Sequence, residues 1–309
     1  MANAARIGLL ALCWGSTFLW IKIALRGLSA VQVTFFRMLI GAAFLALIVF
    51  LIQRKRLPRT PAVWGHLVVS AALANAIPYL LFTVAEEGIR TSSAGVISST
   101  TPMWTLLTTY LWGRESKGRT TRQAGGLLIG FLGCVLIFSP WQTGSDIMSW
   151  GGLECLIAAA FLGVSYVYMD KFLANRDVSP VMLSAGQLAA AGVLLAPALL
   201  VEAAPAPHFR VDALLALLVL GLLGTGVAYV LNYRVISDGG SVAASVVMYL
   251  LPVVAVILGA TVLGEPLTPM TLAGTALVLI GVALPTTRTG VTGNGPHPTR
   301  RSAVRSDMH

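Results

Sequence analysis

The stretch Ser93-Ala94-Gly95-Val96-Ile97, with Pro102 after it, is matched 150 positions later by Ala243-Ala244-Ser245-Val246-Val247, with Pro252 after it. Further pairs share this offset: Ser29 and Ser179, Val31 and Val181, Tyr79 and Tyr229, and Glu115 and Glu265. Apolar sequences produce single matches by chance, but a collinear set is typical of an internal repeat. We therefore predict that residues 1–145 and 146–285 are two copies of one structural unit.

The composition indicates that most of the chain is not in contact with water. Of 309 residues, 56% are hydrophobic and 11% are charged, and the mean hydropathy is +0.82, whereas a soluble domain carries about 25% charged residues. Helices need about 20 apolar residues to cross a bilayer, and such runs lie near 7–24, 31–52, 63–85, 92–112, 122–139, 150–170, 181–201, 211–233, 241–262 and 268–285. Runs this continuous exclude the alternation of a β-barrel. The sequence predicts an all-α polytopic membrane protein with ten transmembrane helices.

The distribution of the basic residues predicts how these helices are oriented across the membrane. If the N-terminus is cytoplasmic, sixteen of the 21 lysines and arginines fall in cytoplasmic segments, and only Arg26, Arg90 and Arg210 fall outside. Since lysine and arginine collect in cytoplasmic loops, we expect both termini to be cytoplasmic and the protein to lie in the inner (cytoplasmic) membrane. Five spans are an odd number, so the second unit is inverted, as in many secondary transporters. Residues 286–309 are predicted to form a disordered basic cytoplasmic tail.

Other function classes lack the residues that they need. The net charge of +9 comes from short runs between apolar stretches and not from one basic face, so nucleic acid is not expected as a partner. Cys13, Cys134 and Cys155 each lie inside an apolar run, a spacing that excludes a disulfide framework or a CxxC metal site. No HExxH or GxSxG motif is present. We predict that the protein is not an enzyme and has no catalytic residue, metal or cofactor.

Several segments resemble the EamA family within the drug/metabolite transporter superfamily. The first is Trp14-Gly15-Ser16-Thr17-Phe18 with Lys22 and Arg37. The second occurs once in each half and consists of a stretch of small residues, then a proline, then a glutamate at a helix end. Its first copy begins at Ser92 and contains Pro102 and Arg114-Glu115, and its second copy begins at Ser241 and contains Pro252 and Leu263-Gly264-Glu265-Pro266. The first copy departs from the family, because Gly113-Arg114-Glu115 replaces Leu-Gly-Glu. The resemblance covers roughly residues 5–285 and implies ten helices around a central cavity between two inverted repeats. It also implies a transporter, since many members are thought to export amino acids, other metabolites or toxic compounds.

The predicted function is therefore secondary active export of small metabolites, such as amino acids or related amphipathic or toxic compounds, by alternating access. One alternative is a membrane scaffold that transports nothing. Another is an exchanger of nucleotide sugars or sugar phosphates, which would call for several basic residues in the cavity, where the spans offer only Lys22 and Arg37. Expected partners are a small-molecule substrate and the lipid bilayer. A proton as coupling ion and a homodimer stay open.

The candidate cavity residues are prolines, polar groups and aromatic rings inside the spans. A mid-span proline kinks a helix, and the freed carbonyls need protein or a watered cavity. A buried amide binds either substrate or a neighbouring helix, and deep aromatic rings suit an amphipathic solute. The predicted set is Trp14, Ser16, Asn75, Pro78, Tyr79, Pro102, Tyr166, Tyr229, Asn232, Tyr249 and Pro252.

Two cations inside spans are predicted to serve a charged gate or ion coupling. A charge at mid-membrane costs about 2.5–3.5 kcal/mol on insertion scales. Arg37 lies about two turns inside its span, so we expect it either to pair with Glu86 or Glu87 as an outer gate or to bind an anionic substrate group. Lys22 lies nearer the outer end and can snorkel. A buried carboxylate with a raised pKa would also suit proton coupling. Glycines 126, 130, 133, 274 and 281 are expected to serve close helix packing.

Overall fold

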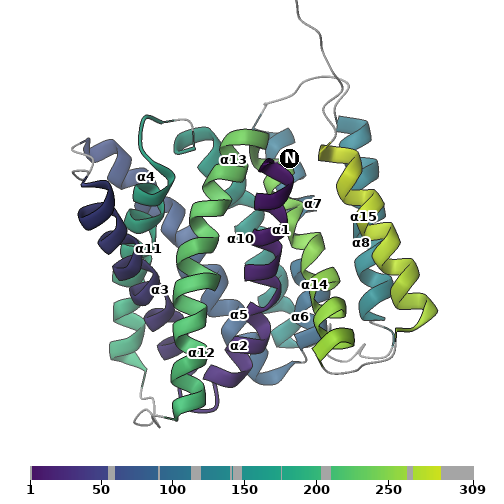
Figure 1. Cartoon of the computed structure of the whole chain (residues 1–309), viewed down its shortest axis with the longest axis horizontal. Coiled ribbons are helices and arrows are strands. Elements are labelled where there is room, and N and C mark those ends of the chain that lie inside the picture. The colour runs from purple at the N-terminus through teal and green to yellow at the C-terminus, as the bar shows by residue number, and fades with distance from the viewer. Residues whose placement is uncertain are drawn as a thin grey trace, which may run out of the picture.

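The computed structural model describes residues 2–54, 60–89, 91–112, 120–139, 141, 148–174, 176–202, 210–262 and 267–286, and none of these residues forms a strand. The glutamates at 115 and 265, and residues 287–309 of the predicted tail, lie outside the described residues. Every apolar run predicted above contains helix (Figure 1). The protein is therefore all-helical, as predicted.

The first half contains eight α-helices and two π-helical turns among its described residues. They are α1 (Ala2–Gly15), α2 (Thr17–Ala24), α3 (Ala30–Leu47), η1 (Ile48–Gln53), α4 (Pro61–Ala71), η2 (Ala72–Ala76), α5 (Ile77–Gly88), α6 (Thr91–Ser98), α7 (Thr101–Leu111) and α8 (Thr120–Phe138). The second half contains α10 (Trp150–Phe172), α11 (Pro180–Val201), α12 (Val211–Gly221), η4 (Leu222–Val227), α13 (Ala228–Ser245), α14 (Val247–Val262) and α15 (Pro269–Thr286).

Among the described residues, six continuous helical segments are long and apolar enough to cross a membrane. They are Ala4–Ala24, Ala30–Gln53, Pro61–Gly88, Trp150–Phe172, Pro180–Val201 and Val211–Ser245. Shorter apolar helices cover Ala124–Ile137 and Pro269–Ala283. This architecture is that of a multi-pass membrane protein, although the other predicted spans are shorter or interrupted. The helix that contains the predicted span 211–233 continues past that range to Gly240, whose φ of 81° breaks it.

Helix starts and breaks recur at equivalent places in the two halves. Ser29 and Ser179 cap α3 and α11, and their Oγ atoms accept hydrogen bonds from Gln32 N (3.1 Å) and Met182 N (3.3 Å). The π-helical turns η2 and η4 lie 150 positions apart, and each joins the two parts of one long helical segment. A π turn leaves backbone carbonyls outside the regular hydrogen-bond ladder, so both halves carry an irregular backbone at the same point.

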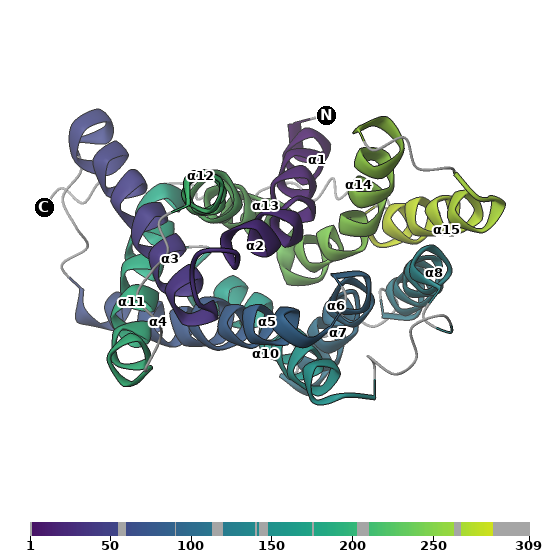
Figure 2. The same cartoon turned by 90° about the horizontal axis from the view of Figure 1, so that it is seen from below.

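The helices form two rows that are closed at both ends (Figure 2). One row contains α12, α2, α13, α1 and α14, and the other contains α4, α5, α10, α6 and α7, while α3 with α11 closes one end and α8 with α15 the other. Each half packs its first long segment on helices of the other half. In the second half α10 packs on α5 and α7. At the equivalent place in the first half, α1 packs on α14 and α2 packs on α12. The largest cluster of buried apolar side chains draws on both halves, from α1 to α14.

The α8–α15 pair is built on glycines, as the sequence predicted. A Cβ added to Gly133 would lie 2.6 Å from the carbonyl oxygen of Gly274, and one added to Gly281 would lie 2.3 Å from the backbone nitrogen of Gly130. Only hydrogen fits between these backbones. The two helices therefore approach as small-residue pairs do in membranes.

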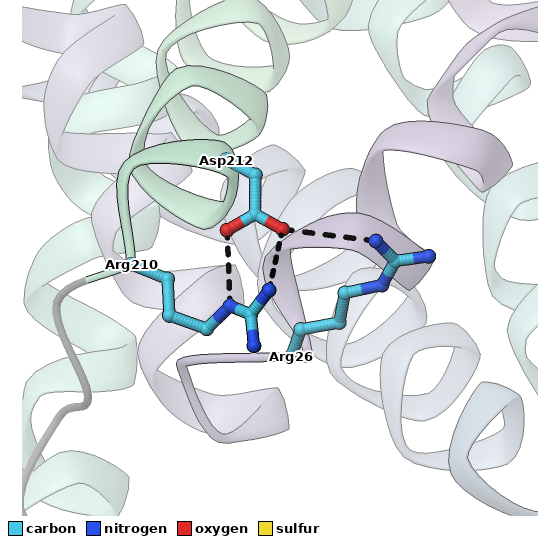
Figure 3. Close-up of polar contacts among 3 residues, drawn as sticks. All are labelled: Arg26, Arg210 and Asp212. Atoms are coloured by element: carbon cyan, nitrogen blue, oxygen red, sulfur yellow. Dashed lines mark hydrogen bonds and ion pairs between the residues drawn. The ribbon is translucent and has the colours of Figure 1, made fainter.

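Ion pairs join the two halves at opposite ends of the molecule. Arg6 of α1 pairs with Asp238 of α13 at one end. At the other end, Asp212 of α12 accepts two hydrogen bonds from Arg210 (3.1 and 3.2 Å) and lies 3.6 Å from Arg26, which follows α2 (Figure 3). The Asp212 carboxylate raises the pKa of the Arg210 guanidinium through these hydrogen bonds and its charge. The α1–α2 segment is thus tied to the α12–α13 segment at both ends.

Candidate functional site

A cavity lies between the two rows of helices and is lined by both halves. It offers about 60 Å³ to the centres of water-sized molecules. From the first half it is lined by Trp14, Thr17, Ile21, Arg37, Ala74, Tyr79, Phe82 and Ser98. From the second half it is lined by Leu162, Ser165, Tyr166, Met169, Tyr229, Asn232, Met248 and Leu251. The six predicted residues that the structure brings together here are Trp14, Arg37, Tyr79, Tyr166, Tyr229 and Asn232.

Aromatic rings form one wall of this cavity. The rings of Trp14 and Tyr229 meet edge to face with centroids 6.0 Å apart, and those of Tyr229 and Tyr79 do so at 6.3 Å. The Tyr229 hydroxyl donates a hydrogen bond of 2.7 Å to the carbonyl oxygen of Ala74, inside η2. A carbonyl in the π turn thereby anchors the tyrosine of the opposite half. The rings give the cavity a rigid apolar surface with large contact area.

Arg37 supplies the cavity's charge. Its side chain is 3% exposed, Nε donates a hydrogen bond of 3.0 Å to Thr225 Oγ1 in η4, and Cζ lies 4.5 Å from the centroid of the Tyr79 ring. Gly224 lies beside this group, since a Cβ there would be 3.7 Å from Arg37 Nη2 and 2.8 Å from Thr17 Cγ2. Close approach of α2 to η4 therefore depends on a glycine. Arg37 is held between the second half and an aromatic face.

The expected pair between Arg37 and Glu86 or Glu87 is not formed, since Arg37 makes no ion pair within the described part of the chain. Arg37 lies over Tyr79, and Glu86 follows seven residues later, about 10 Å farther along α5. Lys22 approaches this end instead: its Nζ donates to the carbonyl oxygens of Glu86 (2.8 Å) and Ile89 (3.4 Å). A cation at the C-terminal carbonyls of a helix is favourable. Glu86 is buried and Glu87 is exposed.

Three buried polar atoms on the cavity wall have no hydrogen-bond partner among the described residues. They are the Nε1 donor of Trp14, the hydroxyl of Tyr166 and the Oδ1 acceptor of Asn232. Their side chains are 6%, 2% and 3% exposed. A buried polar atom without a partner costs about 1–3 kcal/mol, and such exceptions in a folded protein call for an explanation. All three belong to residues that line one cavity, which marks this cavity as a candidate ligand site.

The sequence interpretation missed ten cavity residues, among them Thr17, Ser98 and Ser165. These three hydroxyls donate to the backbone carbonyls three residues earlier in the chain, at 2.5, 2.9 and 2.7 Å, which leaves their oxygen lone pairs for a ligand. The repeat offset held a usable signal. Phe82 and Asn232, and Ser98 and Met248, lie 150 positions apart and line the same cavity.

Asn75 lies beside the cavity and binds another helix, the alternative considered for a buried amide. Its Oδ1 accepts a hydrogen bond of 2.6 Å from Gln187 Nε2, and Gln187 Oε1 accepts from Ser70 (3.0 Å) and from the Tyr233 hydroxyl. Asn75 sits in η2 and Gln187 in α11. This network fixes the π turn of the first half to the second half.

The remaining predicted residues lie outside the cavity lining. Tyr249 is fully buried against α8, where its hydroxyl donates to the Leu127 carbonyl (2.8 Å), because Gly130 leaves room for the ring. The other four mark irregular backbone: Ser16 between α1 and α2, Pro78 after η2, Pro102 in the first turn of α7, and Pro252 inside α14. They shape the helices that carry the lining residues.

A second groove, of about 800 Å³, is lined by residues of α6, α8 and α10 together with Thr100 and the two residues before α10. Its lining is mainly apolar and contains no charged residue among those described. The central cavity combines a cation, aromatic faces and polar atoms without partners, which is the composition of a ligand site. We therefore take the central cavity as the candidate functional site.

The sequence profile of the EamA-like transporter family matches residues 7–139 and again residues 149–287. The chain belongs to the EamA-like transporter family. Among its relatives, an uncharacterized transporter of Archaeoglobus fulgidus is 25% identical over 87% of this chain and 93% of that protein. The uncharacterized inner membrane transporter YedA of Escherichia coli is 27% identical over 90% of this chain and 88% of its own length.

A solved crystal structure shares the fold of this EamA-like transporter. It covers 92% of this chain and 96% of its own, with a TM-score of 0.71 and 18% sequence identity. The family and the apolar helices identify a multi-pass membrane protein of the transporter type, as the sequence predicted. Both of these relatives are named as transporters.

Proposed function

We propose that this EamA-like transporter is a secondary active transporter that exports small metabolites by alternating access through the central cavity. The observation that carries the proposal is the lining of that cavity, to which both halves contribute equally. A site between two repeat units is exposed to each side in turn when one unit rocks against the other. The two profile matches, the paired π turns and the exchanged contacts support an inverted repeat of residues 1–145 and 146–285.

The size of the cavity bears on the mechanism. The space open to the centres of water-sized molecules is about 60 Å³, which corresponds to a few waters. We propose that the cavity widens when a substrate binds. The ion pairs Arg6–Asp238 and Asp212–Arg26 tie α1–α2 to α12–α13 at both ends, so the widening we propose separates this row from the row of α5 and α10.

Orientation is part of the proposal. Cytoplasmic termini and an inner-membrane location follow from the distribution of lysine and arginine. Single cysteines placed in residues 114–122 and at position 265 would be labelled from opposite faces of the membrane if the halves are inverted. Labelling of both from the same face would refute the inverted repeat.

The test of transport is a metabolite screen in cells that overproduce the full chain. We expect lower intracellular pools of the exported compounds and higher resistance to their toxic analogues. Tyr166→Phe removes a hydroxyl that lines the cavity, and we expect it to reduce the export rate. Tyr110→Phe makes the same change at a tyrosine that is 59% exposed and away from the cavity, and we expect it to behave as the wild type. Unchanged pools and resistance, with the protein inserted in the membrane, would favour a non-transporting scaffold.

A further inference from the structure

We propose that the substrate of the central cavity is a small organic monoanion with an aromatic or apolar body, and that its carboxylate binds the guanidinium of Arg37. The inference rests on the proposed function only in taking the central cavity as the substrate site. It names the chemical class of the substrate and the residue that selects it.

The first argument is the electrostatic state of Arg37. Its side chain is 3% exposed and forms no ion pair among the described residues. A buried charge without a counter-ion is strongly unfavourable, and intramembrane arginines pair with a carboxylate, bind backbone carbonyls or serve a ligand pathway. One hydrogen bond to Thr225 and the face of Tyr79 compensate only part of this cost. The carboxylate of a ligand would complete the compensation.

The second argument is the geometry of the guanidinium. Nε is engaged by Thr225, and neither Nη group of Arg37 forms a hydrogen bond with a described residue. A guanidinium presents a planar fork of donors that matches the two oxygens of a carboxylate. Gly224 contributes no side chain next to Nη2, where a Cβ would lie 3.7 Å away. The Nη groups are therefore the part of Arg37 that remains for a ligand.

The third argument is the lining around the charge. Arg37 is the one charged residue among the described lining residues, which disfavours cationic substrates. A polyanion such as a phosphate ester would need more than one cation, so a single carboxylate fits best. The rings of Tyr79, Tyr229 and Trp14 suit an aromatic or apolar body. The Oδ1 of Asn232, which has no partner among the described residues, adds a place for a hydrogen-bond donor on the substrate.

The experiment uses three probes of one shape and different charge: phenylacetate, phenylacetamide and 2-phenylethylammonium. Their binding to the purified full-length protein in detergent is measured by equilibrium titration. We expect the wild type to bind phenylacetate at least about tenfold more tightly than phenylacetamide, as one charge-assisted hydrogen bond provides. The cation is expected to bind most weakly. Arg37→Gln should bring the ratio of phenylacetate to phenylacetamide affinity close to one.

The matched control is Arg26→Gln, which removes an arginine at the surface, outside the cavity, and should leave the wild-type ratio. Arg37→Lys retains the charge and should retain part of the preference, so the test stands even if Arg37→Gln does not fold. Equal affinities for phenylacetate and phenylacetamide in the wild type, no binding of either, or an undiminished preference in a folded Arg37→Gln would each overturn the proposal.

A measurement of flux distinguishes failure of the anion site from failure of the proposed transport function. Proteoliposomes containing the wild type are loaded with radiolabelled phenylacetate or with radiolabelled phenylacetamide, and the release of each compound is followed. Selective binding of phenylacetate without release would leave the anion site standing and contradict transport. Release of phenylacetamide and phenylacetate at equal rates would support transport and contradict the anion site.

Discussion

Replacing Gly133 by alanine tests the packing of α8 on α15. The new Cβ would lie 2.6 Å from both the Gly274 carbonyl oxygen and the Val278 nitrogen, and ordinary contact begins at 3.4 Å. Both neighbours are backbone atoms that cannot rotate away, so the helices must separate by about 0.8 Å. Overpacking of this kind costs typically about 1–3 kcal/mol. We therefore expect Gly133→Ala to lower the free energy of unfolding by that amount.

The assay is unfolding of the full-length protein in mixed micelles, followed by helical circular dichroism. Gly125→Ala is the matched control, because Gly125 belongs to the same helix and nothing lies within 4 Å of its added Cβ. The control should be neutral or more stable by up to about 1 kcal/mol, the difference in helix propensity between alanine and glycine. Equal unfolding free energies for the two variants would refute the conclusion that the helices meet at their backbones.

Three further changes have expected outcomes. Gln187→Leu removes the partner of the buried Asn75 Oδ1 and should destabilise the protein by about 1–3 kcal/mol, measured by the same unfolding assay; an unchanged value would mean that the network contributes nothing. Asp212→Asn removes an exposed ion pair with Arg210 and should lower the free energy of unfolding only slightly, and less at high salt, so a large loss that is insensitive to salt would contradict surface exposure. Tyr229→Phe loses one hydrogen bond and should cost about 1 kcal/mol while changing substrate affinity in the flux assay; unchanged affinity would remove Tyr229 from the site.

The sequence was a good guide to elements whose residues act locally. Apolar runs predicted helices at the observed places, and Ser29 and Ser179, matched by the repeat offset, proved to be equivalent helix caps. The glycines of α8 and α15 were expected to pack closely, since small residues that recur on a lipid-exposed helix have few other uses. The helix that contains the predicted span 211–233 runs farther than that range, because Asp238 and Gly239 stay helical until the φ of Gly240 changes sign.

The candidate site was harder to predict, because side-chain direction depends on packing between distant helices. Tyr249 and Tyr229 are both deep aromatic residues in their spans, yet one faces Gly130 of α8 and the other faces the cavity. Arg37 was expected either to meet a carboxylate of the same half or to bind an anionic substrate group. The structure places it over Tyr79 and against Thr225 of the other half, a contact that the linear order of the residues did not indicate.

Thr225 lies inside the π turn η4. The backbone hydrogen-bond register of this turn therefore affects the position of the Arg37 guanidinium that would bind a charged ligand. A π turn holds one extra residue per turn, which a small rearrangement of hydrogen bonds can pass along the helix. Passing it across Thr225 would rotate that residue by about 100° around the helix axis, the angle per residue of an α-helix. Arg37 would lose its anchor at the same moment. Binding or release of a carboxylate at the Arg37 guanidinium would then be coupled to a shift of the π turn along the α12–α13 segment.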